Sequence, residues 1–580
     1  MSLQSLVNHL MTDTLQTSLP GFMPELAICA TIVVMLLVRI FRFGNRIDPF
    51  TLALIGSLVA FYYAIPEGGI RAIGAVQRQE LFTGMLVYDS MTVFFRLFLV
   101  AFAFWFIILV RMTGLADRQD GQDFYTLLLG STLGMCLMAS ANHLMTVFLA
   151  VEMASVPSYV LAGIIKGRRR ASEASLKYAV YGAGAAGVML YGISLLAGLT
   201  GSAHLPTIAA RLAAMDIPGL IAAHDPKGGG ILMVLVLAAL MIMVGLAFKL
   251  SAVPFHFWCP DVFEGASAEV DAFLSVASKA AAMALLVRVA IGIGTAPTPA
   301  AAPTALHTIP AHTVAFQQPT PGEAASAAVK PSAEDPAANA TLTPTDPAPL
   351  APVRRFMVLL LSVIAAITCT FGNLAAYGQT NIKRMLAYST IAHAGYMLMT
   401  VAAAVQLSGT DPAHAREAVA ALVFYLSCYV FMNLGAFAIV AFLRNTIGSE
   451  EIADYAGLVR TAPFIGVALT AILVSLIGIP PLAGFMGKYA IFLSLVVAGG
   501  PWMIGLLVIA GFNTAISLVY YLRVAKVVCI DPPASEQSTV NIGVLPTVYV
   551  LVVAIPVLIY GIIPEQLLEV ARQATQQLLM

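Results

Sequence analysis

Fourteen long apolar runs constrain the fold of this chain more than any other feature of its sequence. A helix needs ~20 apolar residues to cross the hydrocarbon core of a membrane. Only helices and closed barrels satisfy the backbone in lipid, and these runs are too long for barrel strands. The sequence therefore predicts an all-α polytopic membrane protein with about fourteen transmembrane helices, at residues 23–40, 49–65, 85–110, 123–140, 142–165, 174–198, 231–257, 268–294, 355–376, 382–404, 417–443, 461–496, 500–525 and 544–563.

Composition supports a membrane protein and argues against several other classes. The chain is 59% hydrophobic and 10% charged, whereas soluble domains have about 25% charged residues. Its formal net charge is zero, which argues against a nucleic-acid partner. The six cysteines are scattered through apolar runs without a C-x-x-C pair, so we expect no iron–sulfur cluster, disulfide framework or other metal site. The first apolar run lacks the flanks of a cleaved signal peptide and is predicted to be a retained span.

Lysine and arginine predict the orientation of the spans. If the N-terminus lies outside, the inside loops carry fifteen of these residues and the outside segments carry nine. Loops rich in Lys and Arg stay on the cytoplasmic side. The bias is clearest at the KGRRR run of residues 166–170. It predicts that both termini lie outside.

One segment does not have the composition of a membrane span. Residues 295–353 hold twelve of the 32 prolines, with many alanines and threonines. Such a segment cannot bury a core, and it predicts a disordered linker on the outer side. Its simplest interpretation is an insertion without chemistry. The expected organisation is three N-terminal helices, two repeats flanking the linker, and a last helix, at residues 1–122, 123–294, 354–530 and 531–580.

The stretch "KYAVYGAGAAGVMLYG" contains a G-x-G-x-x-G pattern, formed by Gly182, Gly184 and Gly187. A dinucleotide-binding loop with this pattern follows a strand, opens a helix and precedes an acidic residue by about 20 positions. These glycines instead lie inside an apolar run, and no acid stands near residues 204–210. Small residues let transmembrane helices approach closely. We therefore expect the three glycines to lie mid-helix against another helix.

Charged residues inside the predicted spans are the first candidates for function. An ionisable group near the bilayer centre costs ~3 kcal/mol on insertion scales, so each one needs a partner or a role. Glu152, in "FLAVEMASVPSYVLAG", and Lys279, in "AFLSVASKAAAMALLVRV", each lie ~15 Å into their spans, close to the midplane. The alternative for Glu152 is a structural ion pair. For Lys279 it is helix packing with a buried partner.

Two further lysines stand beside predicted helix breaks. Lys249 precedes Pro254 in "LAFKLSAVPFHFWCPD", and Lys488 follows Pro480 and Pro481 in "IGIPPLAGFMGKYAIF". Proline interrupts a helix, and broken membrane helices occur where the backbone lines a cavity or an ion path. The two broken spans, the seventh and the twelfth, run in opposite directions. This pattern predicts an inverted repeat of spans four to eight and nine to thirteen.

Three other titratable residues are weaker candidates. Lys177 lies within a turn of the inner surface, where its side chain can also reach water. His393, near the middle of span ten, is equally well interpreted as a water ligand on a proton path or as a packed histidine. His256, beside the break in span seven, is a further possible member of the path.

The remaining buried charges receive no transport role. Asp89 and Arg96 lie two turns apart in span three, and we expect them to pair. Arg288 lies close to the outer surface, where we expect its long side chain to extend to the interface.

Buried lysines together with one midplane carboxylate can relay protons. A lysine in an apolar environment can change between its charged and neutral forms. Moving one charge through 100 mV takes ~2.3 kcal/mol, so something external must drive the relay. The chain carries no P-loop, haem ligand set, flavin motif or cluster motif that could supply this drive.

Five motifs give the chain a specific resemblance, over about residues 85–294 and 355–530: "FKLSAVPFHFWCPDVFEGA", "FLSVASKAA", "QTNIKRMLAYSTIAHAGYMLM", "YGISLLAGLTGS" and "GIPPLAGFMGKYAIF". They closely resemble the subunit N family of bacterial NADH–quinone oxidoreductase, respiratory complex I, whose mitochondrial counterpart is NADH dehydrogenase subunit 2. Related antiporter-like subunits usually carry histidine in place of Lys279, which favours subunit N over subunits L and M. The chain also lacks the long amphipathic C-terminal arm of subunit L.

The resemblance implies a proton-translocating, non-redox subunit in the bacterial inner membrane, with both termini periplasmic. Its partners would be the other membrane subunits of complex I, including neighbouring subunit M and the small subunits, in a lipid bilayer. NADH, flavin, clusters and quinone would lie on other subunits, so no cofactor is expected here. The resemblance implies fourteen helices, ten of which form two inverted five-helix repeats. Glu152 and Lys249 would pair in the inner half-channel, Lys279 would connect the half-channels, Lys488 would govern the outer one, and Lys177 would be an auxiliary charge.

Two departures from the family pattern affect this interpretation. Where the family commonly has Pro and Thr after "EGA", this chain reads "SAEVDAF", which places Glu269 and Asp271 at the start of span eight. The linker 295–353 is also longer than expected. The alternatives are a subunit of a stand-alone Na⁺/H⁺ antiporter, which no redox reaction drives, and a subunit of a membrane-bound hydrogenase.

Overall fold

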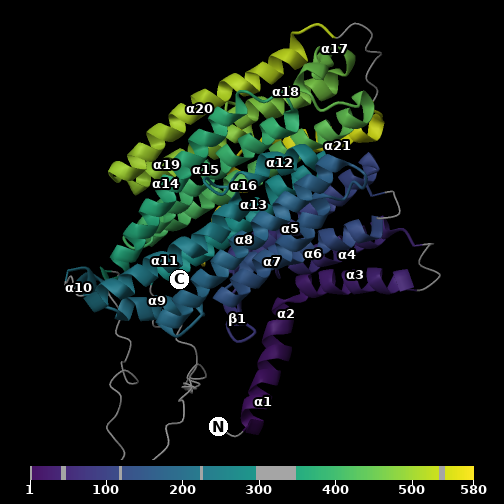
Figure 1. Ribbon diagram of the computed structural model, residues 1–580. Coiled ribbons are helices and arrows are strands. Elements are labelled where there is room, and N and C mark those ends of the chain that lie inside the picture. The colour runs from purple at the N-terminus through teal and green to yellow at the C-terminus, as the bar shows by residue number, and fades with distance from the viewer. Residues whose placement is uncertain are drawn as a thin grey trace, which may run out of the picture.

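The computed structural model describes residues 3–40, 47–116, 121–222, 226–295, 348–533 and 542–579. Long helices pack side by side with roughly parallel axes, and α1 projects from the bundle (Figure 1). In this part of the chain, eleven helices are long and apolar enough to cross a membrane, and four shorter apolar helices accompany them. The prediction of an all-α polytopic membrane protein is confirmed.

The first half of the chain ends with the helix that precedes the predicted linker. Its elements are α1 (Leu3–Thr12), the π-helix η1 (Asp13–Ser18), α2 (Leu19–Gly21), α3 (Met23–Ile40), α4 (Pro49–Ala64), the 3₁₀ helix η3 (Ile70–Ala75), β1 (Gln79–Leu81), β2 (Leu86–Tyr88), α5 (Ser90–Thr113), α6 (Gly121–Ser140), α7 (Leu144–Ala162), α8 (Arg169–Thr200), α9 (Leu205–Ala214), α10 (Ile217–Ala222), α11 (Pro226–Leu250), α12 (Trp258–Gly265) and α13 (Ala268–Gly294).

The second half continues the same arrangement. Its elements are the 3₁₀ helix η5 (Ala348–Leu350), α14 (Ala351–Ala376), α15 (Ile382–Leu407), α16 (Pro412–Ile447), the 3₁₀ helix η6 (Ile452–Tyr455), α17 (Leu458–Thr461), α18 (Pro463–Ile477), α19 (Ala483–Ala498), α20 (Gly500–Cys529), α21 (Val544–Ile562) and α22 (Glu565–Thr575). Each of the fourteen predicted spans overlaps one of the helices or a pair of them. Most of the predicted linker, residues 296–347, lies outside the described residues.

Span three begins later than predicted. The sequence places its start at residue 85, but residues 86–88 form β2, which pairs antiparallel with β1. Gly84 has a positive φ of 85° in the turn between the two strands, a conformation that glycine adopts without steric cost. The helix α5 starts only after Asp89, whose side chain accepts a hydrogen bond from the Thr92 amide at 2.8 Å. An apolar run cannot reveal this boundary, because strand and helix residues are equally hydrophobic here.

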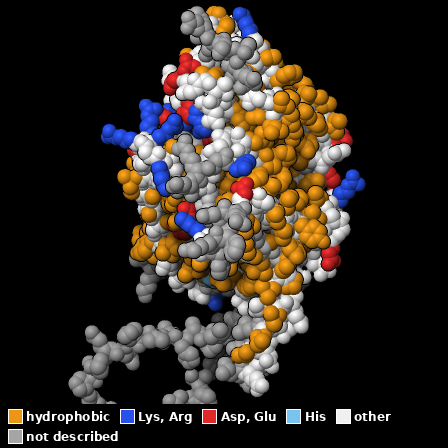
Figure 2. Space-filling view, turned by 90° about the vertical axis from the view of Figure 1, so that its right-hand side faces the viewer, with side chains coloured by type: hydrophobic (Ala, Val, Ile, Leu, Met, Phe, Trp, Pro, Cys, Tyr) orange, Lys and Arg blue, Asp and Glu red, His pale blue; other side chains and the backbone are white. Residues whose placement is uncertain are grey.

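Three helices form the interior of the bundle, and others present apolar surface outwards. In the most hydrophobic windows of α13, α15 and α16, about nine tenths of the residues are buried, whereas fewer than three tenths are buried in those of α3, α20 and α21. In Figure 2 hydrophobic side chains cover a broad continuous area, while lysines and arginines gather on another part of the same face. Exposed apolar helices suit a hydrocarbon environment, since lipid offers no penalty for apolar surface.

The glycine pattern lies within α8, and only part of the packing prediction is confirmed. All three glycines are mid-helix, which excludes a nucleotide loop. A Cβ at Gly182 would lie 2.0 Å from the Tyr159 hydroxyl of α7, so this glycine does allow close packing. Gly184 and Gly187 have nothing within 4 Å, so their predicted contact is wrong for this chain alone. Sequence spacing identified the helix but not which of its sides faces a neighbour.

Candidate functional site

The break in span seven lies directly after Lys249. Helix α11 ends at Leu250, a turn segment follows, and α12 begins at Trp258, which confirms the predicted interruption near Pro254. The Trp258 indole donates a hydrogen bond to the Phe248 carbonyl at 3.0 Å, satisfying one of the carbonyls freed at the helix end. The C-terminal end of a helix carries partial negative charge, which favours a cation such as Lys249 there.

Lys249 points at helix α7, close to Glu152. Its Nζ donates a hydrogen bond to the Ser155 hydroxyl at 3.0 Å, and Ser155 lies one turn after Glu152. Glu152 and Lys249 interact electrostatically, but they do not form a direct ion pair, since Ser155 receives the lysine. The Lys249 side chain is buried, whereas the Glu152 side chain on α7 is only half-buried. The two residues predicted as a pair are therefore neighbours across the α7–α11 contact.

Lys279 occupies the centre of the bundle. It is 1% exposed on α13, and its Nζ lies 3.4 Å from the Thr390 carbonyl of α15. The thiol of Cys259, on α12, also interacts with it electrostatically. Among the described residues no carboxylate pairs with Lys279, and the Thr390 carbonyl is the buried polar group that it contacts.

The break in span twelve holds Lys488 in a similar way. Helix α18 ends at Ile477, and α19 begins at Ala483, so the predicted interruption is confirmed. The Nζ of Lys488 donates to the Ile477 carbonyl at 2.9 Å, which satisfies a group that the broken helix leaves free. It also lies 4.6 Å from the centre of the Tyr396 ring, a cation–π distance. The helices approach closely here, since a Cβ at Gly484 would lie 1.8 Å from the Ser475 carbonyl oxygen.

His393 lies on α15 near groups that both central lysines contact: Thr390, which receives Lys279, is one turn before it, and the Tyr396 ring, which Lys488 contacts, is 5.9 Å away. It interacts electrostatically with both Lys279 and Lys488. Its Nδ1 bonds with the Tyr425 hydroxyl, and its Nε2 lies 3.3 Å from the Tyr521 hydroxyl. A hydrogen-bonded histidine with tyrosine on both ring nitrogens is a polar group inside the bundle, not an isolated packed ring. His256 is different, because its ring packs edge to face against Phe371 at 4.3 Å.

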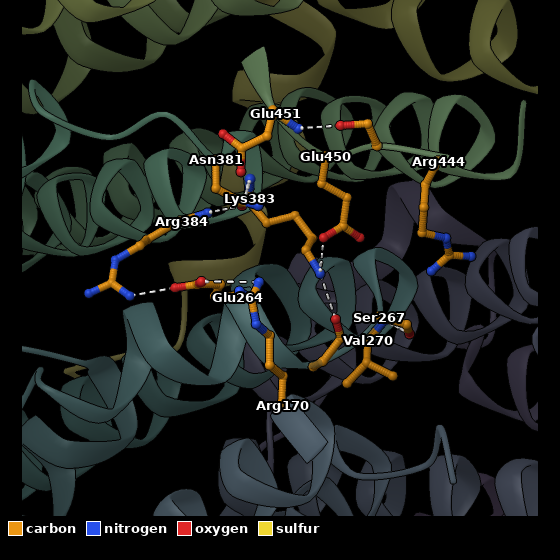
Figure 3. Close-up of polar contacts among 12 residues, drawn as sticks. Arg170, Glu264, Ser267, Val270, Asn381, Lys383, Arg384, Arg444, Glu450 and Glu451 are labelled. Carbon is orange, nitrogen blue, oxygen red and sulfur yellow. Dashed lines mark hydrogen bonds and ion pairs between the residues drawn. The ribbon is translucent and has the colours of Figure 1, made fainter. Parts of the chain in front are cut away.

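Lys177 belongs to a cluster of surface charges. Its Nζ lies 2.7 Å from Asp261 and 2.9 Å from Glu173, and about a third of its side chain is exposed. Asp261 also lies 3.3 Å from Arg384, and Arg384 bonds Glu264 at 2.5 Å. Figure 3 shows Glu264 between Arg384 and Arg170. Lys177 is thus held in ion pairs at one end of the bundle.

The two carboxylates that depart from the family pattern lie at this same end. Glu269 is fully buried, and its oxygens accept hydrogen bonds from Arg444 at 3.0 and 3.3 Å. Asp271 is also fully buried, but neither of its oxygens has a hydrogen-bond partner among the described residues. Lys383 is 1% exposed at the start of α15. Its Nζ lies 2.9 Å from Glu450 and 2.7 Å from the Ala266 carbonyl (Figure 3).

Two predictions about buried arginines are wrong. Asp89 pairs with Arg288, not with Arg96, and Arg288 also donates to the Ala139 carbonyl at 2.9 Å. Arg288 is therefore buried in the bundle and does not extend to the interface. Arg96 instead pairs with Glu25 of α3 at 2.6 Å. Both partners come from helices far away in sequence, which is why spacing along one helix pointed to the wrong pair.

Several polar residues near the lysines escaped the sequence analysis. They are uncharged or lie beside predicted loops, and they include Ser155, Tyr425, Tyr521, Lys383 and Glu450. Hydroxyl groups within apolar runs give little signal, because serine and tyrosine are common in packed helices. No group of three or more His, Cys, Asp or Glu side chains that could hold a metal ion occurs in the described ranges. All six cysteines are free.

Comparison with known proteins places the chain in a family. Residues 141–307 and 314–514 match the family described as NADH:quinone oxidoreductase/Mrp antiporter, TM. NADH-quinone oxidoreductase subunit N of Anaeromyxobacter sp. (strain Fw109-5) is 37% identical over 561 residues, 95% of either chain. Subunit N 2 of Chloroherpeton thalassium is 32% identical over 94% of this chain and 93% of its own.

Solved structures agree with this placement. A chain of respiratory complex I from Thermus thermophilus, determined with bound aureothin, is 29% identical with a TM-score of 0.66, and the match covers 94% of this chain and 98% of that one. A chain of the Mrp complex from Dietzia sp. shares the fold with a TM-score of 0.71 at 17% identity, over 96% and 97% of the two chains. Because the subunit N relatives match over nearly their whole length, the chain belongs to the NADH–quinone oxidoreductase subunit N family of antiporter-like membrane subunits.

Proposed function

We propose that this chain carries protons across the membrane as a non-redox subunit of NADH–quinone oxidoreductase, driven by quinone reduction elsewhere in the complex. The relay would run through Glu152, Lys249, Lys279 and Lys488. The observation that carries the proposal is a series of three lysines that are at most 3% exposed inside a membrane bundle. Among the described residues, none of them is held by a carboxylate partner, so each can exchange a proton without breaking an ion pair.

The geometry supports an order for the relay. Glu152 and Lys249 lie at the α7–α11 contact, Lys279 lies on the central helix α13, and Lys488 lies at the α18–α19 break. His393 lies one turn after Thr390, which receives Lys279, and its ring lies 5.9 Å from that of Tyr396, which Lys488 contacts, so its position supports a carrier role between the two lysines. The two breaks support two inverted five-helix repeats, at 123–294 and 354–530. Lys177 is an auxiliary charge at the end of the bundle, and His256 remains a possible member of the path.

The remaining assignments concern the surroundings of the chain. Its partners are other membrane subunits of complex I, including subunit M and the small subunits. NADH, flavin, iron–sulfur clusters and quinone are carried by those other subunits. The chain resides in the bacterial inner membrane with both termini periplasmic, which puts the cluster of Lys177, Asp261, Glu264 and Arg384 on the cytoplasmic side. The family match favours this function over a stand-alone Na⁺/H⁺ antiporter or a membrane-bound hydrogenase.

The test replaces Lys249 in the assembled complex. Lys249→Ala removes the proton carrier beside Glu152, and Lys249→Arg keeps the charge but cannot release it, because arginine stays protonated. We expect both variants to lose NADH-driven acidification of vesicles, normalised to assembled enzyme. Lys177→Arg is the matched control: its ion pairs with Asp261 and Glu173 suit arginine, so it should pump normally. Full pumping by Lys249→Arg would show that Lys249 is only a structural charge.

A further inference from the structure

Asp271 is a buried acid that the relay described above does not use. It lies one turn into α13, is fully buried, and neither oxygen has a hydrogen-bond donor among the described residues. A carboxylate without donors is costly in a protein interior. Such a group is stabilised by taking up a proton or by binding water. Either state suits a residue that transfers protons.

The neighbours of Asp271 connect it to the surface. Charged groups gather around this end of α13: Glu269 lies two residues before Asp271, and the Nζ of Lys383 lies 2.7 Å from the Ala266 carbonyl, five residues before it. Glu269 and Arg444 bond each other, and Lys383 bonds Glu450. The Glu450 side chain is 17% exposed, so this carboxylate reaches the surface while its partner Lys383 is buried. The Glu450 carboxylate, held by Lys383, thus leads from the surface toward the buried Asp271.

The same helix connects Asp271 to the centre of the bundle. Lys279 follows Asp271 by eight residues, which corresponds to a rise of ~12 Å along the helix. Over the same distance the helix turns so that the two side chains lie on adjoining sides of α13. Ser275 lies between them, one turn after Asp271. The buried thiol of Cys259, on α12, lies within range of the charges of both Asp271 and Lys279. Hydroxyl and thiol groups both donate and accept hydrogen bonds, so the intervening region is not purely apolar.

We propose that Asp271 is the proton uptake residue for Lys279. The proposal rests on the proton-translocating function above. A proton enters through Glu450 and reaches the Asp271 carboxylate, forming its O–H bond. That bond then breaks as the proton passes by way of the Ser275 and Cys259 region to the neutral amine of Lys279, which becomes an ammonium group. Asp271 returns to a carboxylate and is protonated again from the surface.

The experiment compares three carboxylate variants in the whole complex. Asp271→Asn keeps the shape of the side chain but carries no transferable proton. Asp271→Glu restores a carboxyl group. Glu269→Gln makes the same chemical change two residues away, where the amide oxygen can still accept from Arg444. We expect Asp271→Asn to lose NADH-driven acidification per assembled enzyme, Asp271→Glu to recover it, and Glu269→Gln to keep it.

A Lys279→Ala variant separates the two levels of the proposal. If Lys279→Ala loses pumping and Asp271→Asn pumps fully, the uptake role is wrong and the relay stands. If Lys279→Ala also pumps fully, the proposed function itself is wrong. If Asp271→Asn and Glu269→Gln lose acidification equally, the loss comes from removing negative charge at the start of α13. That result would overturn the specific role of Asp271. A loss that Asp271→Glu does not recover would indicate a purely structural requirement and would overturn it too.

Discussion

At the scale of single residues, the structure divides the buried charges into two kinds. Arg96, Arg288 and Lys383 each face a carboxylate at ion-pair distance. Lys249 and Lys279 instead contact a hydroxyl group and a backbone carbonyl. An ion pair fixes a charge in place, whereas a lysine bound only to neutral groups can lose its proton at lower cost. This division indicates which buried charges stabilise the fold and which can carry protons.

The Asp89–Arg288 pair gives a prediction at this scale. Removing one partner of a buried ion pair costs ~3–5 kcal/mol, because it leaves the other charge unpaired, whereas replacing both is often tolerated. Arg288→Met should therefore lower the amount of assembled complex. The double variant with Asp89→Asn should recover most of it, since asparagine keeps the helix cap on Thr92. The measurement is complex abundance on native gels, and normal abundance of Arg288→Met alone would contradict the prediction.

At the scale of elements, helix packing explains why α8 has a glycine at position 192. A Cβ at Gly192 would lie 2.7–2.9 Å from atoms of Met241, Ala238 and Ile242 on α11. Two of those atoms belong to the α11 backbone, which cannot rotate away. The α8–α11 contact therefore requires glycine at this position. Because Lys249 lies in the last turn of α11, the same contact helps to position the candidate relay.

Matched glycine variants test this contact. Gly192→Ala overpacks the α8–α11 contact, which typically costs ~1–3 kcal/mol. Gly187→Ala has open space around it and gains ~0.5–1 kcal/mol of helix stability. We expect the first variant to lower the thermal stability of the purified complex and the second to leave it equal or slightly higher. A Gly187→Ala variant that fails to assemble would instead show that a partner subunit packs closely against this side of α8.

At the scale of the whole molecule, helix α5 runs from one end of the bundle to the other, so its contacts show which elements lie at each end. Its first residue, Ser90, donates to the Ala574 carbonyl of the C-terminal helix α22 at 3.1 Å. Its last residue, Thr113, accepts from Asn445 at 2.9 Å, beside Arg444 and the buried carboxylates. The C-terminal helix and the charged end that holds Lys383 and Asp271 therefore lie at opposite ends of the bundle. The proposed orientation places the first in the periplasm and the second in the cytoplasm.

Cysteine labelling tests that orientation. Arg169→Cys would place a thiol at the exposed start of α8, and Gln566→Cys would place one on exposed α22. A membrane-impermeant maleimide should label Gln566→Cys in right-side-out vesicles and Arg169→Cys only in inverted ones. The parent chain is the control for its own six cysteines, which are buried or partly buried. Labelling of both variants from the same side would contradict the predicted topology.

The sequence by itself determined the fold class, the positions of the spans and the candidate lysines. Apolar runs of membrane length leave the backbone few alternatives to a helix, and proline marks where α11 and α18 must end. Lys249, Lys279 and Lys488 were evident because charge is expensive in such runs. These features are local, so a linear pattern is sufficient to find them.

Tertiary structure alone decided which side chains meet. Arg288 pairs with Asp89 across 199 positions of sequence, and Lys383, at the start of α15, reaches Glu450, which follows the end of α16. Tyr425 and Tyr521 join His393 from different helices. Such contacts depend on how the helices rotate and tilt against each other. The hydrophobic pattern does not specify this in a membrane, because an apolar side chain can face either the lipid or a neighbouring helix. For the same reason the burial of Asp271, and with it the proposed uptake route, became visible only once α13 was packed inside the bundle.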